Sequence, residues 1–267
     1  MATATLVPHL TWRIEPVGDR CLIIRLGDRV DIDVSQTVHA VAAQLMHKAL
    51  PGVIDVVPAF TTVAVHYRAA ARPVTSGSGH VSGHVSGHIS GHASGHASAY
   101  ISPYKQLKRD IDALLSAGVP ALPPSTRVVD IPACYGGEFG PDLEDVATQC
   151  GLSADEVIRR HSQSPLILYT FFFAPGNPFA GPVDPSLQVP RRRTPRTRVP
   201  AGSVAIANGI SSIYQNDSPG GWNIIARTPW NLFDARQNPP TRLQLGDQLR
   251  FVPISRERFA ELLEARS

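Results

Sequence analysis

Turn-forming residues divide the second half of the sequence into short apolar segments, and this pattern limits the folds open to the chain. Beyond Pro165, apolar runs alternate with turns that contain Gly or Pro; they include LILYTFFF at 166–173, SVAIAN at 203–208 and WNIIART at 222–228. The whole chain holds 24 prolines and 21 glycines, which is more than a typical globular protein contains. Short strands between tight turns are typical of an antiparallel barrel or sandwich.

The first part of the chain predicts a sheet with helices on one face. Residues 10–27 contain two short apolar runs around a Gly-containing turn, and residues 52–69 contain two further strands rich in β-branched residues. Between them, residues 34–50 place apolar side chains at helical spacing, with Ser35 as the expected N-cap. The order strand, strand, helix, strand, strand is typical of a small α+β layer.

A Pro-rich segment at 119–126 separates this layer from the strand-rich half. An amphipathic helix is predicted before it, over residues 102–117, with Ser102 as the N-cap. We therefore expect an α+β fold with a small N-terminal α/β domain at 8–123 and a β-barrel domain at 124–267.

A histidine-rich repeat lies between the predicted strands and this helix. Residues 76–98 repeat the unit Ser-Gly-His-X, which gives His80, His84, His88, His92 and His96. Flexible histidines of this kind are candidate ligands for Ni, Zn or Cu, so a metal-buffering role is one hypothesis. The alternative is an unstructured loop, because glycine and serine at half of the positions oppose both a helix and a packed strand.

Composition and charge exclude several classes of protein. No apolar run is long enough to cross a membrane, and the first residues lack the basic flank and apolar stretch of a secretory signal. Three scattered cysteines do not indicate a disulfide framework or a zinc site. We therefore expect a cytoplasmic protein with no membrane partner. The formal net charge of +3 depends on five arginines within residues 190–198, so nucleic acid is not an expected partner either.

The strongest candidate binding residues lie in two segments of the barrel half. The proline-held stretch at 190–198 offers Arg191 and Arg196, whose guanidiniums can meet a carboxylate or phosphate through paired hydrogen bonds. A turn after a predicted strand adds a second group of candidates: Asp217, Ser218, Gly220 and Gly221. Its glycines permit close backbone approach to a ligand. The alternatives are a solvated basic loop and an ordinary hairpin turn.

Three further residues are weaker candidates. Gly202 and Ser203 lie in a turn whose backbone N–H groups can face an anion. His161 is the one histidine of the second half and a weak candidate for a general base. A histidine near the end of a helix more often caps that helix, which is the alternative for His161.

Several long motifs resemble those of one known family. They are IPACYGGEFGPDLEDVA (131–147), APGNPFAG (174–181), VPRRRTPRTRVPAGSVAIA (189–207), IYQNDSPGGWNIIARTP (213–229), LQLGDQLRFVPIS (243–255), VGDRCLIIRLGD (17–28) and GVIDVVPAFTTVAVHY (52–67). Together they resemble the KipI/PxpB family, also called allophanate hydrolase subunit 1, over nearly the whole chain outside the histidine repeat. The chain departs from the family pattern at Asn177, where a large aromatic residue is common.

The resemblance implies a small N-terminal α/β domain followed by a cyclophilin-like antiparallel β-barrel. It also implies a role as the B subunit of an ATP-dependent 5-oxoprolinase, which converts 5-oxo-L-proline to L-glutamate together with partner subunits A and C. Another branch of the family binds and inhibits a sensor histidine kinase, and that regulatory role is the alternative.

The sequence itself does not contain the machinery to use ATP. It has no Gly-x-x-x-x-Gly-Lys-Ser/Thr phosphate loop. ATP is therefore expected to be handled with the partner subunits, of which the C-type protein is the expected closest partner. We expect no tightly bound cofactor and no activity of the chain alone.

The histidine repeat is predicted to be dispensable for folding. Deletion of residues 78–97 should leave the melting temperature within about 2 °C, because the length of a flexible loop has little effect on stability. Thermal unfolding of the deletion variant beside the full chain measures this. A loss of cooperative unfolding would show that the repeat is part of the folded structure.

Overall fold

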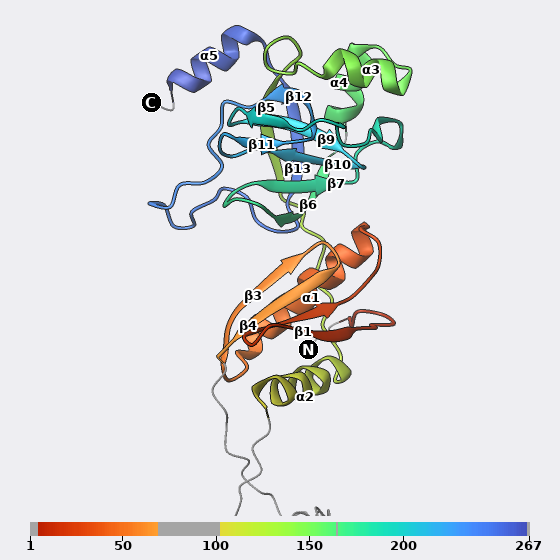
Figure 1. Cartoon of the computed structure of the whole chain (residues 1–267), viewed down its shortest axis with the longest axis vertical. Coiled ribbons are helices and arrows are strands. Elements are labelled where there is room, and N and C mark those ends of the chain that lie inside the picture. The colour runs from red at the N-terminus through yellow and green to blue at the C-terminus, as the bar shows by residue number, and fades with distance from the viewer. Residues whose placement is uncertain (1–4, 69–101, 164, 266–267) are drawn as a thin grey trace, which may run out of the picture.

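A four-stranded sheet and a closed β-barrel form the two halves of the chain (Figure 1). A computed structural model describes residues 5–68, 102–163 and 165–265, so the histidine repeat lies outside the described residues. The predicted α+β fold is confirmed. Among the helices of the described ranges, none has both the length and the apolar character needed to span a membrane.

The N-terminal sheet is antiparallel and alternates buried with exposed side chains. Its strands lie in the order β1 (Arg13–Val17), β2 (Cys21–Arg25), β4 (Thr62–Tyr67) and β3 (Val53–Ala59). Leu22 and Ile24 of β2 and Val63 and Val65 of β4 are fully buried, because every second residue of a strand points to the same face. That face shares one core with α1 (Ile32–Lys48) and α2 (Pro103–Ser116).

The N-cap of α1 differs from the sequence prediction. Asp31 caps this helix, and its carboxylate accepts a hydrogen bond of 2.8 Å from the backbone N–H of Val34. Ser35 lies inside the first turn and is buried, and its hydroxyl has no hydrogen-bond partner among the described residues. Ser102 caps α2 as predicted, accepting from the backbone N–H of Lys105 at 3.3 Å.

Seven strands close the barrel. In order they are β10 (Ile210–Ile213), β7 (Pro178–Gly181), β6 (Leu166–Phe171), β13 (Gln248–Pro253), β5 (Val128–Tyr135), β12 (Asn223–Arg227) and β9 (Ser203–Ala207). Neighbouring strands are antiparallel except β13 and β5, which run parallel. A separate ribbon pairs β8 (Arg196–Val199) with β11 (Ser218–Gly220). Ile131, Leu168, Ile206 and Ile225 are fully buried in the barrel core.

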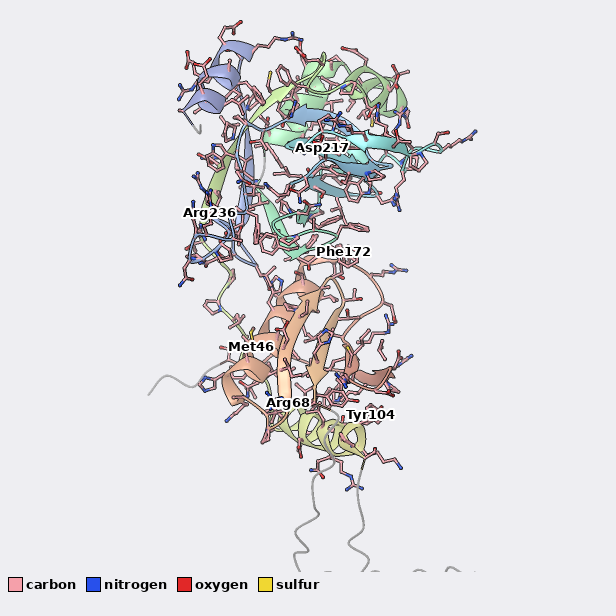
Figure 2. All side chains as sticks on the ribbon, turned by 60° about the vertical axis from the view of Figure 1, so that its left-hand side comes forward. Met46, Arg68, Tyr104, Phe172, Asp217 and Arg236 are labelled. Carbon is pink, nitrogen blue, oxygen red and sulfur yellow. The ribbon has the colours of Figure 1, made fainter. Side chains whose placement is uncertain are left out.

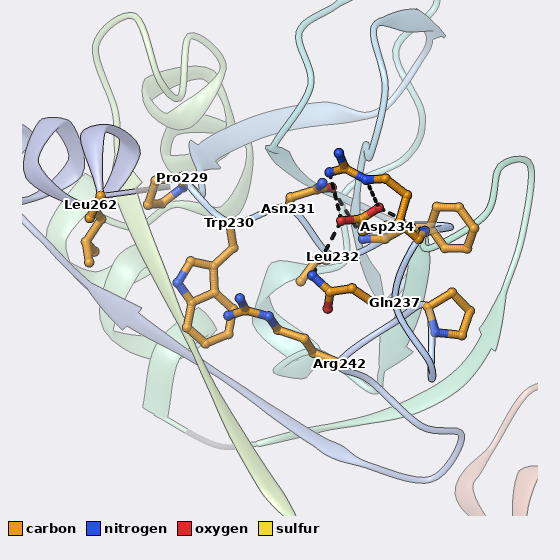
Figure 3. Close-up of a pocket in the computed structure, with 12 residues that line it drawn as sticks. Pro229, Trp230, Asn231, Leu232, Asp234, Gln237, Arg242 and Leu262 are labelled. Carbon is orange, nitrogen blue, oxygen red and sulfur yellow. Dashed lines mark hydrogen bonds and ion pairs between the residues drawn. The ribbon is translucent and has the colours of Figure 1, made fainter. Parts of the chain in front are cut away.

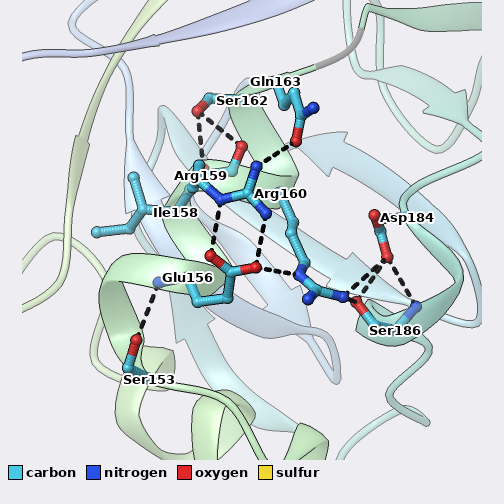
Figure 4. A network of polar contacts seen from close by, with 9 residues as sticks. All are labelled: Ser153, Glu156, Ile158, Arg159, Arg160, Ser162, Gln163, Asp184 and Ser186. Carbon is cyan, nitrogen blue, oxygen red and sulfur yellow. Dashed lines mark hydrogen bonds and ion pairs between the residues drawn. The ribbon is translucent and has the colours of Figure 1, made fainter.

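Within the described part of the chain, three helices and a short 3-10 turn surround the barrel: α3 (Leu143–Cys150), α4 (Ala154–Gln163), α5 (Arg256–Glu264) and η1 (Pro185–Leu187). A polar network on α4 connects it to η1 (Figure 4). The Glu156 carboxylate accepts from Arg159 and Arg160, and these bonds lower the pKa of Glu156 to about 2. Arg160 also donates to the hydroxyl of Ser186 at 2.7 Å, which fixes the helix beside η1.

The sheet meets the barrel through the turn between β3 and β4. Phe60 in this turn makes edge contacts with Phe172 and Phe179, with ring centroids 6.2 Å and 5.9 Å away. Figure 2 places Phe172 at the junction of the two halves. The hydroxyl of Thr170 donates to the carbonyl of Pro58 at 3.1 Å, so polar and aromatic contacts join the halves. The exact division of the chain at 123/124 stays a prediction.

Replacing Ser35 with Ala is predicted to stabilise the protein. The change removes a buried hydroxyl without a partner among the described residues and introduces a better helix former. The free energy of unfolding should rise by up to about 1 kcal/mol, measured by urea denaturation. Ser102→Ala is the matched control, because it removes an N-cap of the same core and should cost about 1 kcal/mol. A stability loss in Ser35→Ala comparable to that of the control would contradict the prediction.

Candidate functional site

A cavity of about 320 Å³ opens beside β7, β10 and the β8–β11 ribbon. Four aromatic side chains line it: Phe173, Phe179, Tyr214 and Trp222. The Phe179 and Trp222 rings meet edge to face at a centroid distance of 5.3 Å, and Phe173 lies 5.9 Å from Phe179. These rings give the cavity an apolar wall suited to a flat ligand group.

Gly220 is required for the shape of this wall. A Cβ atom at position 220 would lie 2.3 Å from the hydroxyl oxygen of Tyr214, which is far inside van der Waals contact. The glycine therefore lets the Tyr214 ring lie against the β11 backbone. Burial raises the pKa of Tyr214, while Arg191 and Arg196 act in the opposite direction, so the phenol stays protonated at neutral pH.

Beside the aromatic rings, the described lining has five polar side chains: Asn177, Arg191, Ser212, Asn216 and Ser218. Asn177 and Ser212 are 6% and 4% exposed. The Asn177 side-chain oxygen accepts from the backbone N–H of Gln215 at 2.6 Å, which turns the amide nitrogen away from that contact. Arg191 forms no ion pair or hydrogen bond with the described residues, and it is the one charged residue among those that line the cavity. The cavity thus offers hydrogen-bond donors and one positive charge.

Two other arginines of the stretch, Arg192 and Arg196, are bound by one buried carboxylate. Asp142 is 1% exposed and accepts two hydrogen bonds from Arg196, at 2.8 Å and 2.7 Å, and a third from Arg192. The backbone N–H of Ile224 also donates to Asp142, at 2.7 Å. Arg196 therefore has an internal carboxylate as its partner, in place of the ligand anion that the sequence suggested.

Of the other predicted binding residues, some line the cavity and others do not. Ser218 and Gly220 line the cavity with Arg191. Gly221 lies beside it and accepts from the backbone N–H of Arg192 at 2.7 Å. Asp217, labelled in Figure 2, is exposed; it accepts from the backbone N–H of Ala201 and pairs with the exposed Arg198.

Gly202 and Ser203 do not reach this cavity. Gly202 lines a separate hollow with Arg227 and Trp230. A Cβ atom there would lie 2.4 Å from the carbonyl oxygen of Thr228, and its φ of +83° also favours glycine. Ser203 is buried at the start of β9. These two residues shape the turn between β8 and β9.

His161 occupies a buried structural position. Its ring is 1% exposed, and its two nitrogens lie 2.7 Å from the hydroxyl of Tyr135 and 2.9 Å from the hydroxyl of Ser211. The ring also stacks on Phe251 at a centroid distance of 4.5 Å. Burial lowers the pKa of His161 to about 3, so the ring is neutral and both nitrogens are occupied. A role as general base toward a substrate does not fit this position.

A second and larger cavity, of about 560 Å³, lies between residues 229–242 and α5 (Figure 3). Two of the three charged groups in its described lining are paired there: Asp234 accepts from Arg236, and also from Gln237. The guanidinium of Arg242 lies over the ring of Trp230, 5.4 Å from its centroid. This cavity therefore offers a ligand fewer available polar groups than the cavity at Arg191.

No described residues form a group of three or more metal-ligating side chains. The five candidate metal-binding histidines of the repeat lie outside the described residues. The metal hypothesis for them stays a prediction.

Sequence reasoning missed most of the cavity. Asn177, Ser212 and the aromatic wall were not predicted as binding residues, although the departure at Asn177 from the usual family pattern was a signal. An amide in place of a large aromatic residue adds hydrogen-bonding capacity to the lining.

Comparison with known proteins identifies the family of this chain. The family described as carboxyltransferase domain, subdomain C and D, matches residues 12–243. The chain belongs to this family. A relative named as the B subunit of 5-oxoprolinase, from Bacillus subtilis (strain 168), is 38% identical over 248 residues, which are 93% of this chain and 95% of that protein. The resemblance to the KipI/PxpB family is thereby confirmed.

Other similar proteins match over shorter parts or at lower identity. A protein of the same name from Escherichia coli O157:H7 is 44% identical over 133 residues, which are 50% of this chain and 61% of that protein. The crystal structure of TTHA0988 is 29% identical, with a TM-score of 0.67 over 88% of this chain and 40% of its own. Kluyveromyces lactis urea carboxylase shares the fold, with a TM-score of 0.68 at 16% identity, and this chain covers 23% of its length.

The pairing of Arg196 with Asp142 predicts that this arginine acts on stability. Arg196→Lys should cost nearly as much as Arg196→Ala, about 1.5–3 kcal/mol, because lysine cannot reproduce the two parallel hydrogen bonds to one carboxylate. Thermal and urea unfolding measure this cost. Arg198→Ala is the control, since its ion pair is largely exposed to solvent and should contribute little. Equal small effects in all three variants would contradict the prediction.

Proposed function

We propose that this chain is the B subunit of an ATP-dependent 5-oxoprolinase complex. In that reaction, 5-oxo-L-proline, ATP and water give L-glutamate, ADP and phosphate. The observation that carries the proposal is the 38% identity to the B subunit of a 5-oxoprolinase over 93% of this chain and 95% of that relative. A match of nearly full length covers the barrel, the N-terminal sheet and the contact between them.

The cavity beside Arg191 supports a role in substrate binding. It combines one unpaired cation with aromatic and amide groups, and 5-oxo-L-proline is a small flat ring that carries a carboxylate. Among the described residues, the lining contains no carboxylate, lysine or histidine that could transfer a proton. We therefore assign substrate binding to this chain and the phosphate chemistry to partner subunits A and C.

The fold also occurs as a part of longer proteins. The chain spans 40% of TTHA0988 and 23% of the Kluyveromyces lactis urea carboxylase. A module that is found fused to further domains is well suited to function in contact with partner proteins. This supports a B subunit that is inactive when isolated.

The proposal predicts that activity depends on assembly. The chain should be produced alone and together with candidate A and C subunits encoded by the same genome, and glutamate release should be measured with and without ATP. We expect turnover only in the mixture that contains all subunits and ATP. Each subunit omitted in turn is the control.

Two outcomes would contradict this proposal. Steady ATP-dependent turnover by the chain alone would show that it needs no partner. A mixture without any turnover, combined with inhibition of autophosphorylation of a sensor histidine kinase by the chain, would favour the regulatory alternative.

A further inference from the structure

Two buried side chains of the cavity carry hydrogen-bonding groups that have no partner within the described residues. The oxygen of the Asn177 amide is occupied by the backbone N–H of Gln215, which leaves its NH₂ group as a free donor. The Ser212 hydroxyl likewise makes no hydrogen bond in the described chain, and both residues are more than nine-tenths buried. Both groups belong to side chains that line the cavity, so they are available to a ligand that accepts hydrogen bonds.

The charge of the lining favours a ligand with an anionic group. Arg191 is the one charged residue among the described residues there, and Asp142, the nearby carboxylate, is already bound by Arg192 and Arg196. No acidic side chain of the described lining neutralises Arg191. An anionic group entering the cavity would therefore meet an unpaired guanidinium, which binds carboxylates through a planar pair of N–H donors.

The remaining lining restricts the shape of the ligand. Phe179 and Trp222 present ring surfaces that are fixed by their mutual edge contact, and Phe179 is supported from behind by Phe60 of the N-terminal sheet. A volume of about 320 Å³ is large enough for a small ring. It is too small to enclose a ligand of nucleotide size completely.

We propose that this cavity binds a small cyclic carboxylate that carries an amide carbonyl, with its carboxylate at Arg191 and its carbonyl at Asn177 and Ser212. The apolar edge of the ring lies against Phe179 and Trp222. The identification of this ligand as 5-oxo-L-proline rests on the proposed function. The cavity alone indicates a small anionic ligand that accepts hydrogen bonds.

The first test measures binding to the purified full chain by NMR titration. Three ligands separate the contributions: 5-oxo-L-proline, 2-pyrrolidinone, which lacks the carboxylate, and cyclopentanecarboxylate, which lacks the amide. We expect each incomplete analogue to bind at least about tenfold more weakly than 5-oxo-L-proline. Signals of Trp222 and Asn177 should shift on binding. Equal affinity for all three ligands, no saturable binding, or shifts confined to residues away from the cavity would overturn the assignment.

The second test uses matched variants. Arg191→Ala and Asn177→Asp should each weaken binding by about tenfold or more, the first by removing the cation and the second by placing a carboxylate beside the ligand. Arg193→Ala is the control for Arg191, because it removes a neighbouring exposed arginine that does not line the cavity. Thermal melts establish that the variants fold. A loss of affinity in Arg193→Ala equal to that in Arg191→Ala would overturn the role of Arg191.

The same variants in the assembled complex distinguish this inference from the proposed function. A complex that converts 5-oxo-L-proline with unchanged KM and kcat in Arg191→Ala and Asn177→Asp would overturn the cavity assignment and leave the proposed function standing. Selective binding of 5-oxo-L-proline by the chain, without turnover by any reconstituted mixture, would support the cavity assignment and contradict the proposed function.

Discussion

The buried carboxylate of Asp142 joins the segments that lie beside the candidate cavity. It accepts hydrogen bonds from Arg192, from Arg196 and from the backbone N–H of Ile224, so one side chain joins the start of α3, the arginine stretch and β12. A buried charge is stable only when such partners surround it. Because these contacts hold the arginine stretch in place, Arg191 is left beside the cavity without a carboxylate of its own among the described residues. Within the described chain, Arg191 thus stays unpaired because the neighbouring Asp142 is already bound by Arg192 and Arg196.

A second constraint comes from the N-terminal sheet. The turn between β3 and β4 places Phe60 against Phe172 and Phe179, and the carbonyl of Pro58 accepts from Thr170 on β6. His39 of α1 adds a hydrogen bond of 2.9 Å to the carbonyl of Tyr169. Since Phe179 lines the cavity, the sheet supports one of its walls from behind. The two halves of the chain therefore contribute to a single site, although the polar groups described in its lining all belong to the barrel half.

Local patterns in the sequence predicted most of the elements but few of the contacts between them. Alternating apolar residues and turn signals indicated the strands, and Ser102 was correctly predicted as an N-cap. Asp31 and Ser35 are both good capping residues, and only the exact start of the helix decides between them. The parallel pairing of β13 with β5 joins segments about 120 residues apart, and no local pattern specifies which strands become neighbours in a closed barrel.

Local sequence patterns also failed to predict the contacts of single side chains at the site. The arginine stretch was visible in the sequence, but the carboxylate that binds Arg196 lies 54 residues earlier, so which arginine stays free could not be deduced. The turn at 217–222 was also visible, yet Ser218 and Gly220 face the cavity while Asp217 faces solvent. Such differences follow from register within a short ribbon that pairs distant segments.

The titratable groups in and near the cavity limit the chemistry that its lining can perform. Burial keeps His161 neutral, with a lowered pKa, and engaged with Tyr135 and Ser211, and the Tyr214 phenol stays protonated because burial raises its pKa. No group of the described lining can therefore act as a base, while several can hold and orient a carboxylate. Under the proposed function, partner subunits would supply the proton acceptor and the phosphate-binding groups, and turnover would require assembly.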